Sequence, residues 1–376
     1  MLRRLAKTGI ACALHWTGAE RLIGTFTRAR NLPWVLGYHR VVENFTASTE
    51  DYMPAMLISR RMLERQLDWI GRRFRFVSLD ELGSRFESGQ SFDKPVAAIT
   101  FDDGYADVYH YAFPMLKRKG IPAGIFVVTD LIGTARLQIY DKLYLLLTSY
   151  FSRWQSASQD LARLLADLEG WLPHLDNMNA VAHDPLTAMR ALITAMPQAE
   201  IYCVIDALEA EVPIDDGTFK DLHSLTWEMV SEMHKAGMTI GSHTKTHALL
   251  PNERWERVSD ETANSRQVLE RRLGTSIIHF AYPDGRFDAA TVSVVADAGY
   301  RLAYTTCLHR NPVYPLLTIP RTLLWENSCM DAFGHFSSST MSCQTSGVFD
   351  LVAGCRQDHG WLRNASPSSP SSFPAP

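Results

Sequence analysis

Residues 97–105 read Ala97-Ala98-Ile99-Thr100-Phe101-Asp102-Asp103-Gly104-Tyr105. The apolar run is typical of a buried strand, and it ends at two adjacent carboxylates followed by a glycine, which allows a turn. Neighbouring side chains on a strand point to opposite faces, so the two aspartates have different surroundings unless the chain turns there. The segment therefore predicts a strand that ends at a site where one carboxylate holds a metal and the other takes a proton. A solvated turn at an ordinary strand end is the alternative.

A second apolar segment ends in a similar way at residues 239–247, which read Thr239-Ile240-Gly241-Ser242-His243-Thr244-Lys245-Thr246-His247. Two histidines four positions apart place their imidazoles on one side of a helical turn. With one carboxylate they make a three-ligand set with open positions, the pattern of a catalytic metal site. Imidazole and carboxylate ligands suit zinc, and they do not exclude cobalt, nickel or manganese. Two unrelated histidines are the alternative.

Three segments together resemble one known family, the NodB-homology polysaccharide deacetylases of carbohydrate esterase family 4. Residues 100–105 are similar to its first motif and residues 241–247 to its second. The third motif is similar to Phe280-Ala281-Tyr282-Pro283-Asp284-Gly285-Arg286-Phe287. The resemblance covers roughly residues 33–324. It implies an α/β fold, a deformed (β/α) barrel of the NodB-homology type.

The resemblance also implies roles for individual residues. Asp103, His243 and His247 match the metal ligands, and Asp102 matches the general base. In the third motif, Asp284 follows Pro283 and is the candidate for the backbone donor to the oxyanion. Tyr282, in the same motif, is grouped with the substrate and oxyanion residues.

Two positions depart from the family pattern. Ala281 stands where many members have an arginine that holds the catalytic aspartate, and Asp284 stands where an aromatic residue often follows the proline. The Asp284 carboxylate is expected to change substrate preference. Arg321, in Ile319-Pro320-Arg321, can take over the role of the missing arginine; an ordinary surface arginine is the alternative.

Two histidines are candidates near the site. Tyr38-His39-Arg40-Val41 is similar to the opening strand of many family members. His39 therefore faces substrate, orients another side chain, or is simply satisfied at a strand end. The family's general acid is a histidine in a Leu-x-x-His motif, of which no clean copy exists here. His309, in Cys307-Leu308-His309-Arg310, is the nearest by position, with His39 as an alternative and a loop histidine without a role as another.

Strand and helix patterns alternate along most of the chain. Strands are expected at 34–42, 76–79, 97–101, 122–129, 239–242, 277–283, 300–306 and 318–321, and helices at 59–72, 79–86, 109–119, 226–237, 251–273 and 289–298. This alternation predicts a parallel sheet, and the catalytic residues of a closed barrel lie at the C-terminal ends of its strands. From about residue 133 to residue 222 only helical spacing is found, which predicts a helical insertion that covers or extends the substrate groove.

Length and composition set further limits. The 376 residues suffice for one large barrel or two ordinary domains, and a net charge of −4 gives no reason to expect a nucleic-acid partner. The six scattered cysteines lack Cys-x2-Cys spacing, so neither a zinc ribbon nor a disulfide framework is predicted. The expected organisation is a basic, amphipathic segment at 1–30, the barrel at 31–330, and a weakly structured to disordered tail at 331–376.

At the N-terminus, basic residues precede an apolar patch that is too short for a signal peptide or for a membrane span of about 20 residues. An amphipathic helix that contacts a membrane surface is expected, in a cytoplasmic or membrane-peripheral protein. The oligomeric state stays open. The predicted function is metal-dependent removal of N-acetyl groups from a surface or secreted polysaccharide, its precursor or a chitin-like oligosaccharide. Hydrolysis of a small non-sugar amide, or glycan binding without turnover, is the alternative.

Overall fold

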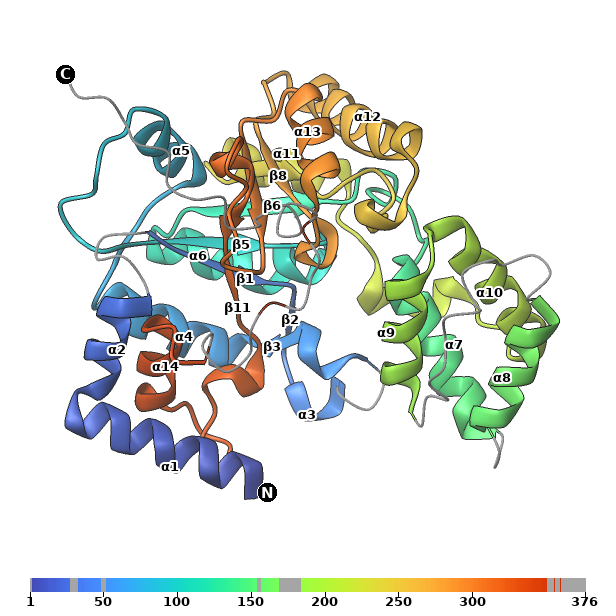
Figure 1. Ribbon diagram of the computed structural model, residues 1–376, viewed down its shortest axis with the longest axis horizontal. Helices are drawn as coiled ribbons and strands as arrows, with labels where there is room; N and C mark the ends of the chain where they lie inside the picture. Colours follow the sequence, from blue (N-terminus) through green and yellow to red (C-terminus); the bar gives the residue numbers. More distant parts are fainter. Residues whose placement is uncertain are drawn as a thin grey trace, which may run out of the picture.

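The computed structural model describes residues 2–27, 33–48, 52–153, 157–168, 184–349, 355 and 359. At its centre is a parallel sheet in the order β10-β9-β8-β7-β6-β5-β1-β11, with β4 paired to β5 (Figure 1). Its strands are β1 (Trp34–Tyr38), β4 (Arg75–Phe76), β5 (Val96–Phe101), β6 (Ala123–Val127), β7 (Thr239–Ser242), β8 (His279–Ala281), β9 (Leu302–Thr305), β10 (Ile319–Pro320) and β11 (Thr322–Leu323). Two further strands, β2 (Arg40–Val42) and β3 (Leu57–Ser59), pair with each other.

The sheet closes through residues 319–323. β10 pairs with β9 on one side, β11 pairs with β1 on the other, and Arg321 lies between them. Since these pairs are parallel, the C-terminal ends of the strands meet at one rim of the barrel. The predicted α/β barrel is confirmed.

Helices cover the outside of the barrel. They are α4 (Arg60–Gly71), α6 (Phe113–Lys119), α11 (Trp227–Lys235), α12 (Trp255–Leu273) and α13 (Ala289–Asp297). Helix α5 (Leu79–Glu87) instead contributes Leu79 and Leu82 to the interior of the barrel. The hydroxyls of Ser59 and Thr226 cap α4 and α11, as the sequence predicts. α6 begins four residues later than predicted, because a π-helical turn at Val108–Ala112 precedes it.

Side chains of the barrel strands divide between two apolar clusters. One combines Val35, Ala98, Phe126, Ala281 and Tyr304 with residues of α5, and fills the interior of the barrel. The other takes the alternate positions of the same strands and packs them against the outer helices. This alternation decides which residues beyond each strand end face the interior.

The strand predicted at 34–42 is interrupted at His39. β1 belongs to the barrel, whereas β2 leaves it and pairs with β3. The buried carboxylate of Asp107 holds β2 in this direction, because it accepts hydrogen bonds from the Arg40 Nε–H at 2.9 Å and the Val41 backbone N–H at 3.1 Å. His39 is thereby left at the rim.

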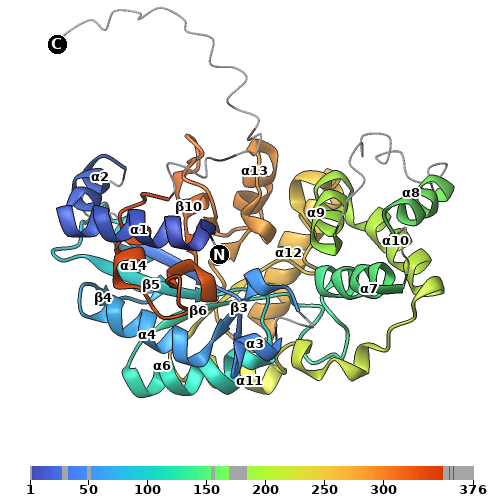
Figure 2. The same cartoon turned by 90° about the horizontal axis from the view of Figure 1, so that it is seen from below.

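In its described residues, the range expected to be a helical insertion contains four α-helices with an apolar cluster of their own. They are α7 (Ile139–Arg153), α8 (Ala157–Leu168), α9 (Pro185–Ala195) and α10 (Gln198–Glu211). Figures 1 and 2 both show this group beside the barrel, on the opposite side of the molecule from α1 and α2. The start of α7 reaches the barrel, where Asp141 accepts a hydrogen bond from the Tyr105 hydroxyl.

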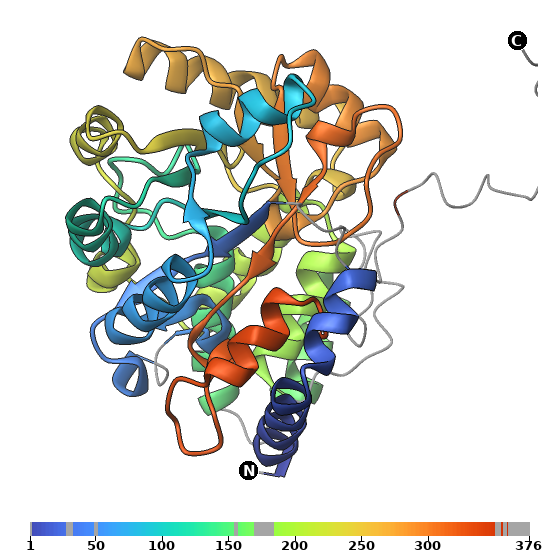
Figure 3. The same cartoon turned by 90° about the vertical axis from the view of Figure 1, so that its left-hand side faces the viewer.

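The two ends of the chain come together. Helices α1 (Leu2–Thr17) and α2 (Ala19–Thr27) pack against α14 (Ser338–Thr345) (Figure 3). A short helix, α3 (Phe45–Ser48), contacts β3. α14 lies where a weakly structured tail was expected; its buried Met341 and Cys343 and a hydrogen bond from Trp69 Nε1 to Ser338 Oγ at 2.7 Å fix it. Residues 366–376 are outside the described part. Among the described helices, none combines the length and apolar character needed to cross a bilayer.

Candidate active site

Three strand ends bring the candidate residues to one rim. Asp102 and Asp103 follow β5, His243 follows β7, and Asp284 follows β8. β5 and β7 both pair with β6, so their C-terminal ends are two strands apart. The acidic and histidine segments, far apart in the sequence, are thus neighbours in the fold.

Asp103, His243 and His247 converge on a common point. Asp103 Oδ1 lies 3.0 Å from His247 Nε2 and 3.4 Å from His243 Nε2, and all three side chains are buried. Zinc holds nitrogen and oxygen ligands at about 2.0–2.2 Å, which puts tetrahedral ligand atoms about 3.4 Å apart. The spacing therefore fits a divalent ion.

Unpaired polar atoms point to the same conclusion. Asp103 Oδ2 is buried without a hydrogen-bond partner among the described residues. His243 Nδ1 faces the Ala281 carbonyl oxygen at 2.7 Å, which directs Nε2 toward Asp103 in the way that outer partners orient metal ligands. Burial opposes ionisation of Asp103, but the charge of His247 and the histidine hydrogen bonds outweigh it, and the Asp103 pKa lies well below its ordinary value. The carboxylate is the form that binds metal.

The rim contains an unusual set of backbone conformations. Among the described residues, the non-glycine positions with positive φ are Asp103 (70°), Thr244 (69°), His247 (65°) and Asp284 (53°). Such conformations cost about 1–3 kcal/mol each and cluster at functional sites. Hydrogen bonds from the His247 N–H to Thr244 Oγ1 and from the Thr244 N–H to Ser242 Oγ hold two of them. At Asp103 the conformation turns the carboxylate away from its position on a regular strand.

Asp102 is held by Arg321 rather than by a third-motif arginine. The guanidinium donates from Nη1 to Asp102 Oδ1 and from Nη2 to Oδ2, both at 2.7 Å, and also from Nη1 to Thr100 Oγ1 at 3.0 Å. Asp102 follows Ala98 and Thr100 on the interior face, where Arg321 enters from the closing strand. Burial alone would raise the Asp102 pKa, but the charges of Arg321 and His243 outweigh it and lower the pKa. Asp102 is therefore a fixed carboxylate beside the metal-ligand set.

Of the other predicted residues, His39 and Asp284 lie at this rim. His39 is half-buried, and burial lowers its pKa, with the negative charges of Asp103 and Asp102 opposing the shift. Asp284 is exposed in the turn Pro283–Gly285 that follows β8.

Tyr282 and His309 do not join the group. The Tyr282 hydroxyl donates to the Leu317 carbonyl oxygen at 3.0 Å and its backbone N–H to the Tyr304 carbonyl oxygen at 3.1 Å. Tyr282 faces the outer layer because it is one residue out of step with Ala281, so a substrate or oxyanion contact for it is wrong. His309 lies instead beside Cys307, Cys355 and His359.

The start of α7 contributes residues that sequence reasoning missed. Gln138 Nε2 donates to Asp103 Oδ1 at 3.4 Å, and the Tyr140 ring meets the His247 ring edge-on with centroids 4.7 Å apart. The Tyr140 hydroxyl is buried and has no hydrogen-bond partner among the described residues. Burial, with the charges of Asp284 and Asp103, raises the Tyr140 pKa, so the phenol keeps its proton. The one available signal was a polar start to an otherwise apolar helix.

Asp141, on α7, is a further buried acid. It accepts a hydrogen bond from the Tyr105 hydroxyl at 2.6 Å, and burial raises its pKa to about 7 against the lowering effect of Arg40. The pair links α7 of the insertion to the residue that follows Gly104. The insertion is thus joined to the rim through buried polar contacts.

Comparison with known proteins gives consistent matches. Residues 89–167 and 188–303 match the family model described as polysaccharide deacetylase. The chain is 30% identical over 253 residues to YxkH of Bacillus subtilis (strain 168), which covers 67% of this chain and 60% of that protein. It is 29% identical over 121 residues to a poly-beta-1,6-N-acetyl-D-glucosamine N-deacetylase of Staphylococcus aureus (strain MSSA476), covering 30% of this chain and 41% of that protein. The matched region thus spans 60% or less of these relatives' lengths.

A solved structure shares the fold. The Streptococcus pyogenes deacetylase PplD in complex with acetate superposes with a TM-score of 0.50 at 19% sequence identity. The match covers 79% of this chain and 93% of that one. At this identity the likeness concerns the barrel alone.

Proposed function

Because the chain belongs to the NodB-homology family of polysaccharide deacetylases, we propose that it removes N-acetyl groups from a polysaccharide or oligosaccharide by metal-dependent amide hydrolysis. The observation that carries the proposal is the pairing of a buried three-ligand set with an arginine-held carboxylate at one rim. A metal-ligand set beside a fixed carboxylate suits hydrolysis of an unreactive amide, because a metal ion polarises the carbonyl group and a carboxylate can take a proton from water.

We propose that Asp103, His243 and His247 hold the ion, and that it is zinc. Two imidazoles and one carboxylate are a common catalytic zinc set, which leaves a coordination position open. When bound, the ion would supply Lewis-acid chemistry, polarising a carbonyl group and lowering the pKa of water toward about 7.

We propose that Asp102 accepts the proton of the attacking water. Both of its oxygens are bonded to Arg321, which fixes the plane of the carboxylate and leaves a second lone pair on each oxygen. The positive charge that lowers the Asp102 pKa keeps it ionised, as a base must be at the start of the reaction.

For the proton that goes to the leaving amine we propose His39, since His309 lies in a different cluster. His39 is near enough to Asp102 and Asp103 for their charges to affect its pKa. For the oxyanion we propose the backbone N–H of Asp284. The exposed Asp284 carboxylate at the same place would disfavour anionic glycans, so a neutral N-acetylated chain is the expected substrate class.

Tyr140 is proposed to donate a hydrogen bond to the substrate, because its buried phenol has no partner among the described residues and stands over the ring of His247. Tyr140→Phe should lower kcat/KM by on the order of 10- to 100-fold, the range between loss of one ordinary hydrogen bond and loss of an oxyanion donor. Metal content should not change. Tyr144→Phe, one turn further along α7, is the control and should keep wild-type kinetics. Equal activity of Tyr140→Phe and wild type would remove Tyr140 from the site.

The substrate class can be tested by mass spectrometry of products. The Staphylococcus aureus relative is named for poly-beta-1,6-N-acetyl-D-glucosamine, so β-1,6- and β-1,4-linked N-acetylglucosamine oligomers are the first substrates, with a small aryl acetamide alongside. We expect the zinc-loaded protein to remove acetyl groups from oligomers and leave the acetamide intact. Hydrolysis of the acetamide alone would favour a small-amide hydrolase; oligomer binding without acetyl loss would favour a glycan-binding barrel.

We also propose a peripheral membrane contact through α1. Its outward face carries Leu5, Ile10 and Trp16, which are 47%, 61% and 93% exposed, whereas Lys7 turns inward and donates to the Ser328 carbonyl oxygen at 2.8 Å. A soluble helix normally has the reverse arrangement. Exposed apolar residues on a helix with a basic start suit the surface of an anionic bilayer.

Vesicle sedimentation tests this contact. Wild-type protein should sediment with phosphatidylglycerol-containing vesicles, and Ile10→Ser with Trp16→Ser should reduce the bound fraction about tenfold or more, since two large apolar side chains contribute several kcal/mol. Phe333→Ser removes an apolar side chain that is 82% exposed elsewhere, and it should bind as wild type does. Equal sedimentation of all three proteins would contradict the contact.

A further inference from the structure

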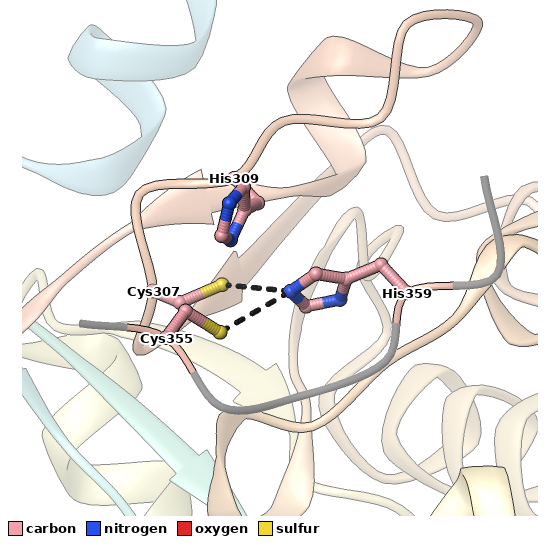
Figure 4. A group of neighbouring side chains, drawn as sticks. All are labelled: Cys307, His309, Cys355 and His359. Carbon is pink, nitrogen blue, oxygen red and sulfur yellow. Dashed lines mark hydrogen bonds between the residues drawn. The ribbon is translucent and has the colours of Figure 1, made fainter. Parts of the chain in front are cut away.

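A second group of metal-ligating side chains lies away from the rim triad. Cys307 and His309 follow β9, and Cys355 and His359 come from the C-terminal part of the chain (Figure 4). One ligand atom from each lies within 4.8 Å of the others. Two segments about fifty residues apart thus converge on one point.

The distances suit a shared ion. His359 Nε2 lies 3.5 Å from Cys307 Sγ and 3.4 Å from Cys355 Sγ. Zinc binds sulfur at about 2.3 Å and imidazole nitrogen at about 2.0–2.1 Å, so tetrahedral sulfur and nitrogen ligands lie about 3.6 Å apart. Figure 4 shows both thiols directed at the same ring nitrogen, which can pair with only one of them as a hydrogen-bond acceptor.

The histidines are arranged as ligands. His359 is fully buried, its ring stacks on Phe287 with centroids 4.3 Å apart, and its Nδ1 faces the Phe287 carbonyl oxygen at 3.0 Å. This contact directs Nε2 to the thiols, as second partners of ligating histidines do. The ring of His309 lies 5.0 Å from that of His359, and its Nδ1 is buried without a partner among the described residues.

We propose that Cys307, His309, Cys355 and His359 bind a zinc ion as a closed structural site, independent of the deacetylase function. A Cys2His2 set fills all four positions of tetrahedral zinc, so no position remains for water or substrate. Binding releases the two thiol protons to solvent and leaves two thiolates on the ion. The ion ties the C-terminal segment to the end of β9 and to α13, whose Ala289 N–H already donates to the His359 carbonyl oxygen at 3.2 Å.

The proposed site departs from two expectations. Sequence spacing predicts no zinc ribbon, because the cysteines lack Cys-x2-Cys spacing, and the proposed site instead takes one cysteine and one histidine from each of two segments. His309 was the nearest candidate for the general acid, whereas here its role is to hold the C-terminal segment.

Cobalt absorption separates this site from the rim triad, which has no sulfur. The full chain carrying Asp103→Ala is stripped with chelator and titrated with Co²⁺ alone. One equivalent should bind and give the near-ultraviolet charge-transfer band of thiolate ligands. In the Asp103→Ala chain, adding Cys307→Ser and Cys355→Ser should abolish the band. In a chain with Asp103 intact, the same two serine substitutions should lower the zinc content from two equivalents to one. Cys12→Ser with Cys203→Ser, which removes two exposed thiols, should change neither.

Maleimide labelling of the wild-type protein tests the same site without the cysteine variants, which can fail to fold. In zinc-loaded wild-type protein, Cys307 and Cys355 should resist maleimide, and removal of zinc should make both react. A Cys307–Cys355 disulfide in protein purified with zinc, or cobalt binding without a thiolate band, would overturn the proposal. Loss of deacetylase activity has no part in these readouts, so failure of the proposed function would leave them unaffected.

Discussion

Asp103→Ala is expected to remove one metal equivalent and to lower the rate of acetate release by more than about 1,000-fold, since metal-ion catalysis supplies several kcal/mol of transition-state stabilisation. Asp103 gives the set its only carboxylate, and its Oδ1 stands between the two histidine nitrogens. Metal analysis and an acetate assay on the same sample measure both effects. Asp206→Ala, an exposed carboxylate on α10, is the matched control and should match wild type.

Backbone strain calls for a second variant. Asp103 has a φ of 70°, which alanine adopts less readily than aspartate or asparagine, so the alanine variant also loses stability. Asp103→Asn keeps the shape and the tolerance of this conformation, and is a weaker ligand because it is neutral. It should fold as wild type does and still lose most of the metal. Wild-type metal content with full activity in Asp103→Asn would contradict the assignment.

Asp102→Asn is expected to keep the metal and to lower kcat by about 100- to 10,000-fold, the usual contribution of a general base. The amide nitrogen would meet a guanidinium donor of Arg321, leaving a buried charge without its partner. Breaking a buried pair costs about 3–5 kcal/mol, so the melting temperature should fall as well. Metal content, kcat and thermal unfolding, measured together, separate lost chemistry from lost folding.

Arg321→Gln provides the complementary test. Arg321 lowers the Asp102 pKa, so its removal leaves burial unopposed and raises that pKa. A base with a higher pKa is protonated at a higher pH, and the acidic limb of the kcat/KM profile should therefore move to higher pH. The double variant Asp102→Asn, Arg321→Gln should regain part of the lost stability but none of the activity. Full activity of Asp102→Asn, or an unmoved acidic limb in Arg321→Gln, would contradict the pair's role.

The sequence predicts the strand ends of the rim because their signals are local. Asp102, Asp103 and His243 each end an apolar run, and strand alternation then places them on one edge of a parallel sheet. The error at Tyr282 has a different cause. Side chains alternate between the two faces of a strand, and Tyr282, although it belongs to the third motif, is one position out of step with the interior face. The sequence distinguishes such neighbours only when the exact strand end is known.

Long-range partners escape local patterns. Arg321 meets a carboxylate 219 positions earlier, and only the closing strand brings it there. Tyr140 reaches His247 from an inserted helix whose apolar spacing reveals nothing of the rim. Cys307 and His359 lie 52 positions apart in the sequence, and no local pattern predicts that their side chains meet.

The decisive measurement is acetate release from N-acetylglucosamine oligomers by one protein sample before chelation, after chelation and after zinc is restored. Release should stop when the ion at Asp103, His243 and His247 is removed, and it should return with one equivalent of zinc at that site. Release that continues in fully stripped protein would contradict a metal-dependent deacetylase, and so would the absence of release from protein with zinc bound at the rim.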